Sequence, residues 1–394
     1  LNSLCMPSVS GTPLSIVPAI RNRENMKIVD VNPFFYPFRG GIEHRMHDTS
    51  RLLAAEGHDV TVLTGRLPDT SEEETTAEGY RIVRLRSTLI NIYNPPFISS
   101  KDVLETLKSL DPDIVNYNYR WAPSYNKDLK RYDGKKVFTF HNMWGEGIGM
   151  QAKMSEANDK RFTSCLNTFG HVIAVSDYVR NDLIRRGYSP EYVTAIPTGL
   201  SKYPEVGKGD GDHILSLGRL VRTKGLDHLV EAMKDVDHKL IICGRGPDEE
   251  RLAKRIKQLG LEEKIVMKGW VSEEEKEDLM GSCRFFVMPS LFESLGLAAI
   301  EIMAHGRPII HTDVNGLPET VRDGGIAVPP GDPAALSAAI NMLLDDPKYV
   351  EELGKNALTQ AQKYRWDGLI SKIEAVYEKT ISGEYSAKDI RKGI

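Results

Sequence analysis

Two glutamates frame the stretch of this sequence that is richest in potential chemistry. In FFVMPSLFESLGLAAIEIMAHGR, residues 285–307, an apolar strand-like run ends at a Pro-Ser pair and Glu293 lies in the loop that follows. Glu301 lies about one turn into a predicted helix. One interpretation is structural, with Glu293 favouring the helix dipole and Glu301 on a solvated face. The apolar residues around Glu301 disfavour that interpretation, because they predict a buried helix.

The start of this helix could bind a specific ligand. A helix N-terminus offers N–H groups without intrahelical partners and a partial positive charge, which together favour an anion. Two carboxylates beside an anion would repel it unless the ligand also presented hydroxyl groups. A nucleotide-diphosphate sugar presents both a diphosphate and hydroxyls.

A loop with two cations is the second candidate. The strand-like run 213–217 is followed by Gly218, Arg219 and Lys224. Cations at the carboxyl edge of a sheet suit a diphosphate, since each charge-assisted hydrogen bond contributes roughly 1.5–3 kcal/mol. They could also stabilise the charge on a departing nucleotide diphosphate. Ordinary surface cations are the alternative, and a P-loop is excluded because the Gly-Lys-Ser/Thr ending is missing.

Three further turns follow strand-like runs. Gly40 and Gly41 would let the backbone approach a ligand that a Cβ would exclude, or they form a simple tight turn. His141 directly follows the run 136–140, although a lone histidine is more often structural. Gly244 lies in a turn expected to shape a base pocket. An NAD-dependent oxidoreductase is disfavoured, because Glu249 stands where the third glycine of the dinucleotide fingerprint belongs.

Strand-like and helix-like segments alternate along the chain in two rounds. Runs rich in Val and Ile, together with other apolar runs, predict strands at 27–32, 58–64, 113–117, 136–140, 171–175, 213–217, 239–243, 265–268, 285–288 and 308–311. Helical patterns between them include 42–56, 177–186, 226–234, 248–259, 297–304 and 334–344. The predicted fold class is α/β, with two Rossmann-like doubly wound domains facing a central cleft. Ligands of such sheets bind at the carboxyl ends of the strands.

Length and composition agree with a folded two-domain protein. A chain of 394 residues exceeds a single hydrophobic core, which stops growing near roughly 250–300 residues. The net charge of −4 argues against nucleic acid as a partner. The four cysteines are widely spaced, which favours reduced thiols in a cytoplasmic protein, and no apolar run approaches the ~20 residues of a membrane span. Residues 1–25, rich in Ser and Pro, are interpreted as a disordered extension before Met26.

Taken together, these residues resemble the retaining glycosyltransferases of family 4, which have the GT-B fold. The most specific match is Glu293 and Glu301, separated by seven residues within FESLGLAAIE. The glycine pair, His141, the two cations and Asn315-Gly-Leu-Pro-Glu support it. The resemblance covers residues 26 to about 381.

The resemblance implies roles for the matched residues. Glu301 would hold the donor ribose, Glu293 would hold the sugar, and His141 would bond the transferred sugar. The catalytic set that it implies is His141, Arg219, Lys224 and Glu293. The donor-binding set that it implies is Gly40, Gly41, Gly218, Arg219, Lys224, Gly244, Glu293, Ser294, Leu295, Gly296, Leu297 and Glu301.

The resemblance also implies the reaction and the domain boundaries. Members usually retain the anomeric configuration and need no metal, so we expect no cofactor beyond the co-substrate, a UDP- or GDP-sugar. Residues 26–198 would form the acceptor-side domain and residues 199–365 the nucleotide-sugar domain. A last helix at about 366–382 would cross back onto the first domain, with a tail at 383–394.

The acceptor side departs from the family pattern. Asn116–Trp121 stand where many relatives have histidine-rich residues, and Asn142 replaces an acid. A glycan, a lipid-linked or a small-molecule acceptor therefore all stay open. Residues 120–136 carry six cations against two acids, with Trp121 and Tyr125. That stretch would suit peripheral contact with an anionic membrane at its cytoplasmic face, or it is an ordinary solvated surface.

Two other functions fit the same residues. A nucleotide-sugar epimerase also binds a diphosphate between two such domains, but it changes the sugar without an acceptor. A non-catalytic sugar-nucleotide binding subunit would bind the donor without turnover.

Overall fold

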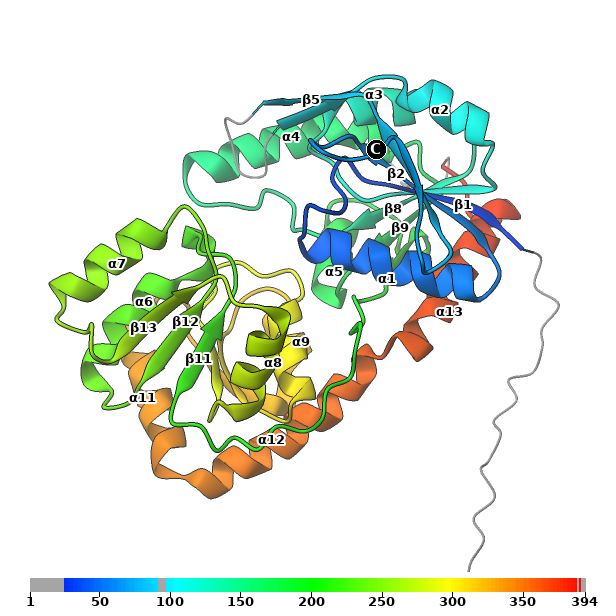
Figure 1. Ribbon diagram of the computed structural model, residues 1–394. Helices are drawn as coiled ribbons and strands as arrows, with labels where there is room; N and C mark the ends of the chain where they lie inside the picture. The colour runs from blue at the N-terminus through cyan, green and yellow to red at the C-terminus, as the bar shows by residue number, and fades with distance from the viewer. Residues whose placement is uncertain (1–24, 91–96, 388–389, 391–394) are drawn as a thin grey trace, which may run out of the picture.

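The computed structural model describes residues 25–90, 97–387 and 390. They form two α/β halves, each built around its own sheet (Figure 1). The extension predicted at 1–25 lies outside the described residues except for Asn25, and so does Cys5.

The sheet of the N-terminal half has eight strands in the order β10-β9-β8-β7-β1-β2-β4-β3. All neighbours pair in parallel except β3 and β4. The strands are β1 (Lys27–Val31), β2 (Asp59–Gly65), β3 (Glu73–Thr75), β4 (Arg81–Leu85), β7 (Ile114–Tyr117), β8 (Lys136–Phe140), β9 (His171–Ala174) and β10 (Val193–Ala195). A separate antiparallel pair consists of β5 (Ser87–Ile90) and β6 (Phe97–Ser100).

The sheet of the C-terminal half has six parallel strands in the order β13-β12-β11-β14-β15-β16. They are β11 (Ile214–Leu217), β12 (Leu240–Cys243), β13 (Ile265–Gly269), β14 (Phe286–Met288), β15 (Ile309–Thr312) and β16 (Gly325–Val328). The strand order reverses between β11 and β14 here, and between β1 and β7 in the first sheet. Ligands of doubly wound sheets bind at such reversal points.

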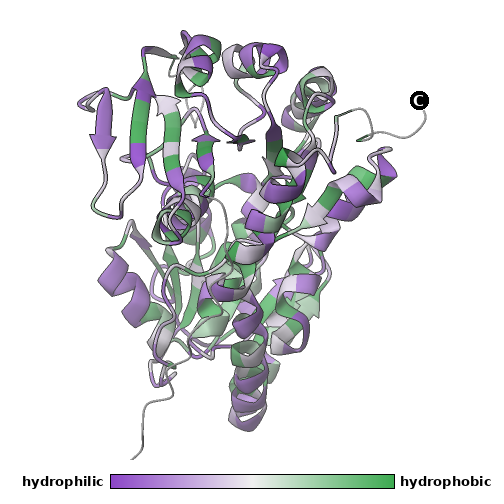
Figure 2. Cartoon of the chain, turned by 90° about the vertical axis from the view of Figure 1, so that its right-hand side faces the viewer, coloured by the Kyte–Doolittle hydropathy of each residue, from purple (hydrophilic) through white to green (hydrophobic). Residues whose placement is uncertain are grey.

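Helices cover both faces of each sheet. They are α1 (Gly41–Ala55), α2 (Val103–Leu110), α3 (Pro123–Arg131), α4 (Met150–Leu166), α5 (Asp177–Arg185), α6 (Leu226–Ala232), α7 (Glu249–Gln258), α8 (Glu273–Ser282), α9 (Leu297–Ala304), α10 (Leu317–Val321), α11 (Pro333–Asp345), α12 (Pro347–Ala361) and α13 (Trp366–Ile381). Hydrophobic stretches line the interior, whereas polar residues occupy much of the outer helix surface (Figure 2).

The last helix lies on the sheet of the N-terminal half. Trp366, Ile370 and Tyr377 of α13 share a buried cluster with Ile28 of β1 and Met46 of α1. The chain therefore returns to its first half after completing the second, as Figure 1 shows.

The predicted fold class is confirmed. Each predicted strand run contains a strand, and each predicted helical pattern contains a helix. The sequence prediction missed α8 because its first turn is acidic, at Glu273, Glu274 and Glu275, and only Leu279 and Met280 are buried, so no apolar periodicity marks it. It begins instead at a polar cap, since Ser272 accepts from the N–H of Glu275.

Candidate functional site

Charged residues meet at the reversal point of the C-terminal sheet. Gly218, Arg219 and Lys224 line a small pocket together with the ends of β11, β12 and β14. Lys224 forms an ion pair with Glu293, which lies in the loop after β14. The two loops are tied by their backbones, since the Leu291 N–H donates to the Thr223 carbonyl at 2.7 Å. An ammonium group has three donors, so Lys224 can bind Glu293 and still contact a diphosphate.

The start of α9 lies beside this ion pair. Gly296 precedes the helix with φ 85°, and Ser294, Leu295 and Leu297 adjoin it. The segment before α10 supports this loop, because the Gly316 N–H donates to the Glu293 carbonyl at 3.0 Å. A Cβ on Gly316 would lie 2.2 Å from the Ser294 carbonyl oxygen, so the close approach requires glycine.

Glu301 lies on α9 and is partly buried. Its side chain keeps 27% of its surface exposed, and Lys276 of α8 lies 3.5 Å from its carboxylate. Burial raises the pKa of Glu301, whereas the charge of Lys276 lowers it. The carboxylate is therefore held near one cation and retains access to a ligand hydroxyl. The solvated-face interpretation does not fit this partial burial.

The residues that follow β11 and β12 are in close contact, next to Arg219 in the chain. Gly218 (φ 151°) and Gly244 (φ 132°) end neighbouring strands, and a Cβ on Gly244 would lie 1.9 Å from the Gly218 carbonyl oxygen. A Cβ on Gly218 would meet nothing within 4 Å, so its backbone faces open space. The backbone conformation of both residues favours glycine, and the open side permits close approach by a ligand.

The glycine pair of the N-terminal half begins α1. Gly40 caps the helix, and a Cβ there would lie 2.5 Å from the Glu43 carboxylate, whereas a Cβ on Gly41 would meet nothing within 4 Å. Glu43 accepts a hydrogen bond of 3.0 Å from Asn32, which follows β1. Burial raises the pKa of Glu43 to about 7, so this carboxyl titrates near neutral pH.

A buried polar network orients His141. Its Nε2 lies 2.9 Å from Asn118 Oδ1, while the amide nitrogen of Asn118 donates to Asp30 and to the Val31 carbonyl. Asn118 therefore presents an acceptor, and His141 must carry its proton on Nε2. Burial lowers the pKa of His141 well below its usual value, and the charge of Arg45 lowers it further. The imidazole is thus neutral, with Nδ1 as its acceptor atom.

Hydrogen bonds connect the two halves at this site. Ser294 Oγ donates to the His141 carbonyl at 2.7 Å. The Glu319 carboxylate accepts from the N–H groups of Asp177 and Tyr178, at 2.7 and 2.8 Å, and so caps the start of α5. Two of the sequence-predicted residues, Ser294 and His141, therefore meet at a boundary between the halves.

Tyr119 is a residue of this boundary that the sequence did not single out. Burial raises the pKa of Tyr119 to about 12, and the charge of Glu43 raises it while Arg120 and Arg219 lower it. The phenol thus lies among charges from both halves. Glu43 was also missed, although an acid two residues after a glycine pair was a usable signal. Asp30 was missed too, and its signal was an acid inside an apolar strand run.

The cationic stretch predicted at 120–136 is partly wrong. Arg120 and Lys136 are each only 4% exposed, and Tyr125 is fully buried. Arg120 pairs with Asp159, and Lys136 donates to backbone carbonyls. The exposed cations that remain there are Lys127, Lys130, Arg131 and Lys135.

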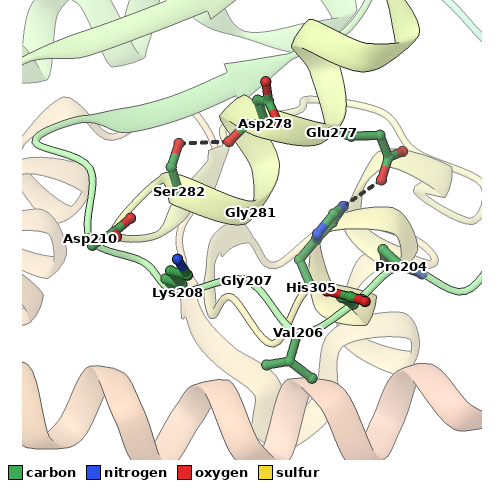
Figure 3. A pocket seen from close by; sticks show the side chains of 11 residues that line it. Pro204, Val206, Gly207, Lys208, Asp210, Glu277, Asp278, Gly281, Ser282 and His305 are labelled. Atoms are coloured by element: carbon green, nitrogen blue, oxygen red, sulfur yellow. Dashed lines mark hydrogen bonds and ion pairs between the residues drawn. The ribbon is translucent and has the colours of Figure 1, made fainter.

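A larger hollow lies under the linker between the halves. It has a volume of about 340 Å³ and is lined by residues such as Lys208, Asp210 and His305, which pairs with Glu277 at 3.1 Å (Figure 3). None of the predicted donor residues lines it. Three acids (Glu205, Glu277 and Asp278) line it besides Asp210 and the single lysine Lys208, an excess of negative charge that does not suit a diphosphate.

Within the described ranges, no group of three or more His, Cys, Asp and Glu side chains is arranged to hold a metal. No helix in that part of the chain is long and apolar enough to cross a bilayer.

Comparison with known families decides the assignment. Residues 39–201 match the model of Glycosyltransferase Family 4, and residues 204–360 match that of Glycosyl transferases group 1. The chain belongs to glycosyltransferase family 4. As a member of this family, the enzyme uses a nucleotide-sugar donor in hexosyl transfer.

Relatives of this glycosyltransferase cover most of its length. It is 32% identical over 357 residues to an uncharacterized glycosyltransferase of Methanocaldococcus jannaschii, covering 88% of this chain and 96% of the relative. It is 28% identical over 379 residues to the phosphatidyl-myo-inositol mannosyltransferase of Mycobacterium leprae. That match covers 90% of this chain and 96% of the relative.

Solved structures support the GT-B fold of the glycosyltransferase. Sucrose-phosphate synthase from Thermosynechococcus elongatus has a TM-score of 0.79 at 22% identity, covering 91% of this chain and 100% of that one. HepE from Anabaena, solved with UDP and glucose, has a TM-score of 0.73 at 18% identity. That match covers 90% of this chain and 100% of HepE.

Proposed function

We propose that this enzyme is a retaining hexosyltransferase that takes its sugar from a UDP- or GDP-sugar and delivers it to a hydroxyl acceptor. The observation that carries the proposal is the convergence of Arg219, Lys224 and Glu293 at one sheet edge, next to the start of α9, the helix that also carries Glu301. Cations and a helix N-terminus suit the diphosphate, and the carboxylates suit hydroxyls.

The cations would act mainly on the departing group. As the bond between the anomeric carbon and the diphosphate oxygen breaks, negative charge grows on the nucleotide diphosphate. Arg219 and Lys224 stabilise that charge more in the transition state than in the bound donor, which lowers the barrier. No metal is needed for this role in the proposed mechanism.

Donor hydroxyls would be held from both halves. Glu301 binds the ribose, and Glu293 with the backbone of 294–297 binds the hexose and the near phosphate. Gly41 and Gly218 leave room for the donor, and Gly244 shapes the base pocket. Neutral His141 accepts a hydrogen bond at Nδ1 from a hydroxyl of the transferred sugar.

The proposed domains follow these roles. Residues 26–198 with α13 form the acceptor-side domain, and residues 199–365 form the donor domain. The acceptor is a glycan, a lipid-linked or a small molecule. Two relatives carry names that include phosphatidyl-myo-inositol and phosphatidylinositol, so inositol-containing acceptors come first in a screen. The proposed compartment is the cytoplasm, with peripheral membrane contact through the exposed cations of 127–135.

Donor turnover tests the proposal. The purified protein would be incubated with a panel of UDP-, GDP- and ADP-sugars, and the products followed by proton NMR. The expected result is hydrolysis or transfer of at least one donor, with the first-formed product in the donor's own anomeric configuration. Binding without turnover, or a changed sugar still joined to its nucleotide, would refute it in favour of a binding subunit or an epimerase.

A further inference from the structure

The segment between β8 and α4 carries a carboxylate that the donor site does not use. Glu146 follows His141 on this segment and is half-buried. Its Oε2 accepts a hydrogen bond of 2.9 Å from Asn142 Nδ2. Among the described residues, no other hydrogen bond to this carboxylate is found, so one oxygen remains for a ligand.

A buried ion pair holds this segment in place. Arg120 donates to Asp159 Oδ1 at 2.5 Å and to the Met143 carbonyl at 2.6 Å. Asp159 also accepts from the Gly145 N–H at 2.8 Å. The side chains of the pair are 4% and 0% exposed. Breaking a buried pair is strongly unfavourable, so the backbone that leads into Glu146 is fixed by its neighbours.

Charges from both halves surround Glu146. Burial raises the pKa of its carboxyl, Glu293 raises it further, and Arg120 and Lys224 lower it. The loop that carries Glu293 also donates a hydrogen bond to the His141 carbonyl, at the start of the same segment. In Figure 1 the segment before α4 runs between the two halves. Glu146 therefore belongs to the N-terminal half and lies near enough to the Lys224–Glu293 ion pair for both charges to act on its carboxyl.

The negative charge of the Glu146 carboxylate determines which ligand group it can bind. A carboxylate repels a diphosphate, so Glu146 does not hold the phosphates. A hydroxyl is the matching partner, because an ionised carboxylate is a hydrogen-bond acceptor only. His141, which is proposed to contact the transferred sugar, begins the same segment as Glu146.

We propose that Glu146 binds the attacking hydroxyl of the acceptor and takes its proton; this inference rests on the proposed function. In that step the hydroxyl oxygen forms a bond to the anomeric carbon of the donor on the same face from which the diphosphate leaves, so that the anomeric configuration is retained. The bond from that carbon to the diphosphate oxygen breaks, and its electron pair leaves with the nucleotide diphosphate. The hydroxyl proton moves to the free oxygen of Glu146.

The experiment compares Glu146→Gln and Glu146→Asp with the control Glu156→Gln. Glu156 lies on α4, is 51% exposed and pairs with Lys160 at 3.0 Å, so its variant removes the same charge outside the site. Turnover of the active donor is measured with water and with added glycerol as hydroxyl probes. The affinity for the free nucleotide diphosphate is measured by calorimetry, and it also reports correct folding.

We expect Glu146→Gln to slow turnover with both probes about 100-fold, in the range of general base catalysis, with nucleotide affinity within twofold of wild type. The turnover of Glu146→Asp should lie between that of Glu146→Gln and that of wild type, and the turnover of Glu156→Gln should equal that of wild type. Wild-type turnover should decline as pH falls through the raised pKa of Glu146, and Glu146→Gln should lose that decline.

Two outcomes would overturn the inference while leaving the proposed function intact. In one, Glu146→Gln turns over the donor within twofold of wild type. In the other, its loss of turnover is matched by an equal loss of nucleotide affinity, which would place Glu146 on the donor. Absence of turnover in the wild type would instead refute the proposed function, and this inference with it.

Discussion

The two halves build their sides of the site in different ways. In the C-terminal half the residues lie in short local segments, 218–224 and 293–301, and offer individual charged groups and a helix start. In the N-terminal half, Asp30 lies in β1, Asn118 follows β7 and His141 follows β8, and the three are joined by a chain of hydrogen bonds. The comparison supports the proposal that the first side binds the donor, whereas the second positions one side chain against it.

The largest effect is expected at the cations. Arg219→Ala should lower kcat about 100- to 1,000-fold, because it removes stabilisation that grows in the transition state. Steady-state kinetics would measure it, with Arg222→Ala as a control, since Arg222 lies on the same loop with 70% of its side chain exposed. A loss confined to KM would place Arg219 in uniform substrate binding and break the assignment.

Glu301→Ala should act mainly on donor binding. Loss of a hydrogen bond to a charged group should raise the donor KM about 10- to 100-fold, with a smaller change in kcat. A donor titration at fixed acceptor concentration measures both parameters. An effect on kcat as large as that of Arg219→Ala would erase the division of roles between the two.

A smaller effect is expected in the network of the N-terminal half. Asn118→Ala removes the acceptor of His141, so the imidazole can change tautomer and rotate. Turnover should fall about tenfold, the value of one hydrogen bond, while nucleotide affinity stays within twofold. If nucleotide affinity falls equally, the two halves do not differ as proposed.

The smallest effect on activity is expected for Asp30→Asn, which should alter stability instead. Burial raises the pKa of Asp30 from 3.8 to about 7. The folded state therefore binds the proton more tightly than the unfolded state, and the stability of the wild type is lost as pH rises from about 4 to about 7. Asn keeps an acceptor for Asn116 and Asn118 without the charge.

At pH 8 the free energy of unfolding of Asp30→Asn should be roughly 1–3 kcal/mol larger than that of wild type. This difference in stability should shrink as the pH is lowered towards 4. Denaturant titration across this range measures it. A variant that is less stable than wild type at pH 8 would contradict the account of the buried carboxyl.

The same contrast explains how much could be predicted from the sequence. The spacing of Glu293 and Glu301, and the cations after β11, are local patterns, so the donor side and the fold were predicted from residue types alone. On the N-terminal side, Gly40, Gly41 and His141 were singled out, but the network behind His141 was not, because Asn118 acquires its role from Asp30, 88 residues earlier in the chain. Arg120 was misassigned to the surface for the same reason, since its partner Asp159 lies 39 residues away. Pairings across a parallel sheet leave no periodic signal.

Calorimetric binding of UDP and GDP to three proteins tests the central claim most directly: wild type, Lys224→Ala and Asn118→Ala. The account predicts that wild type binds at least one of the two nucleotides, that Lys224→Ala binds it at least tenfold more weakly, and that Asn118→Ala binds it within twofold of wild type. Equal affinity in wild type and Lys224→Ala would contradict the claim that the C-terminal half holds the diphosphate by charge.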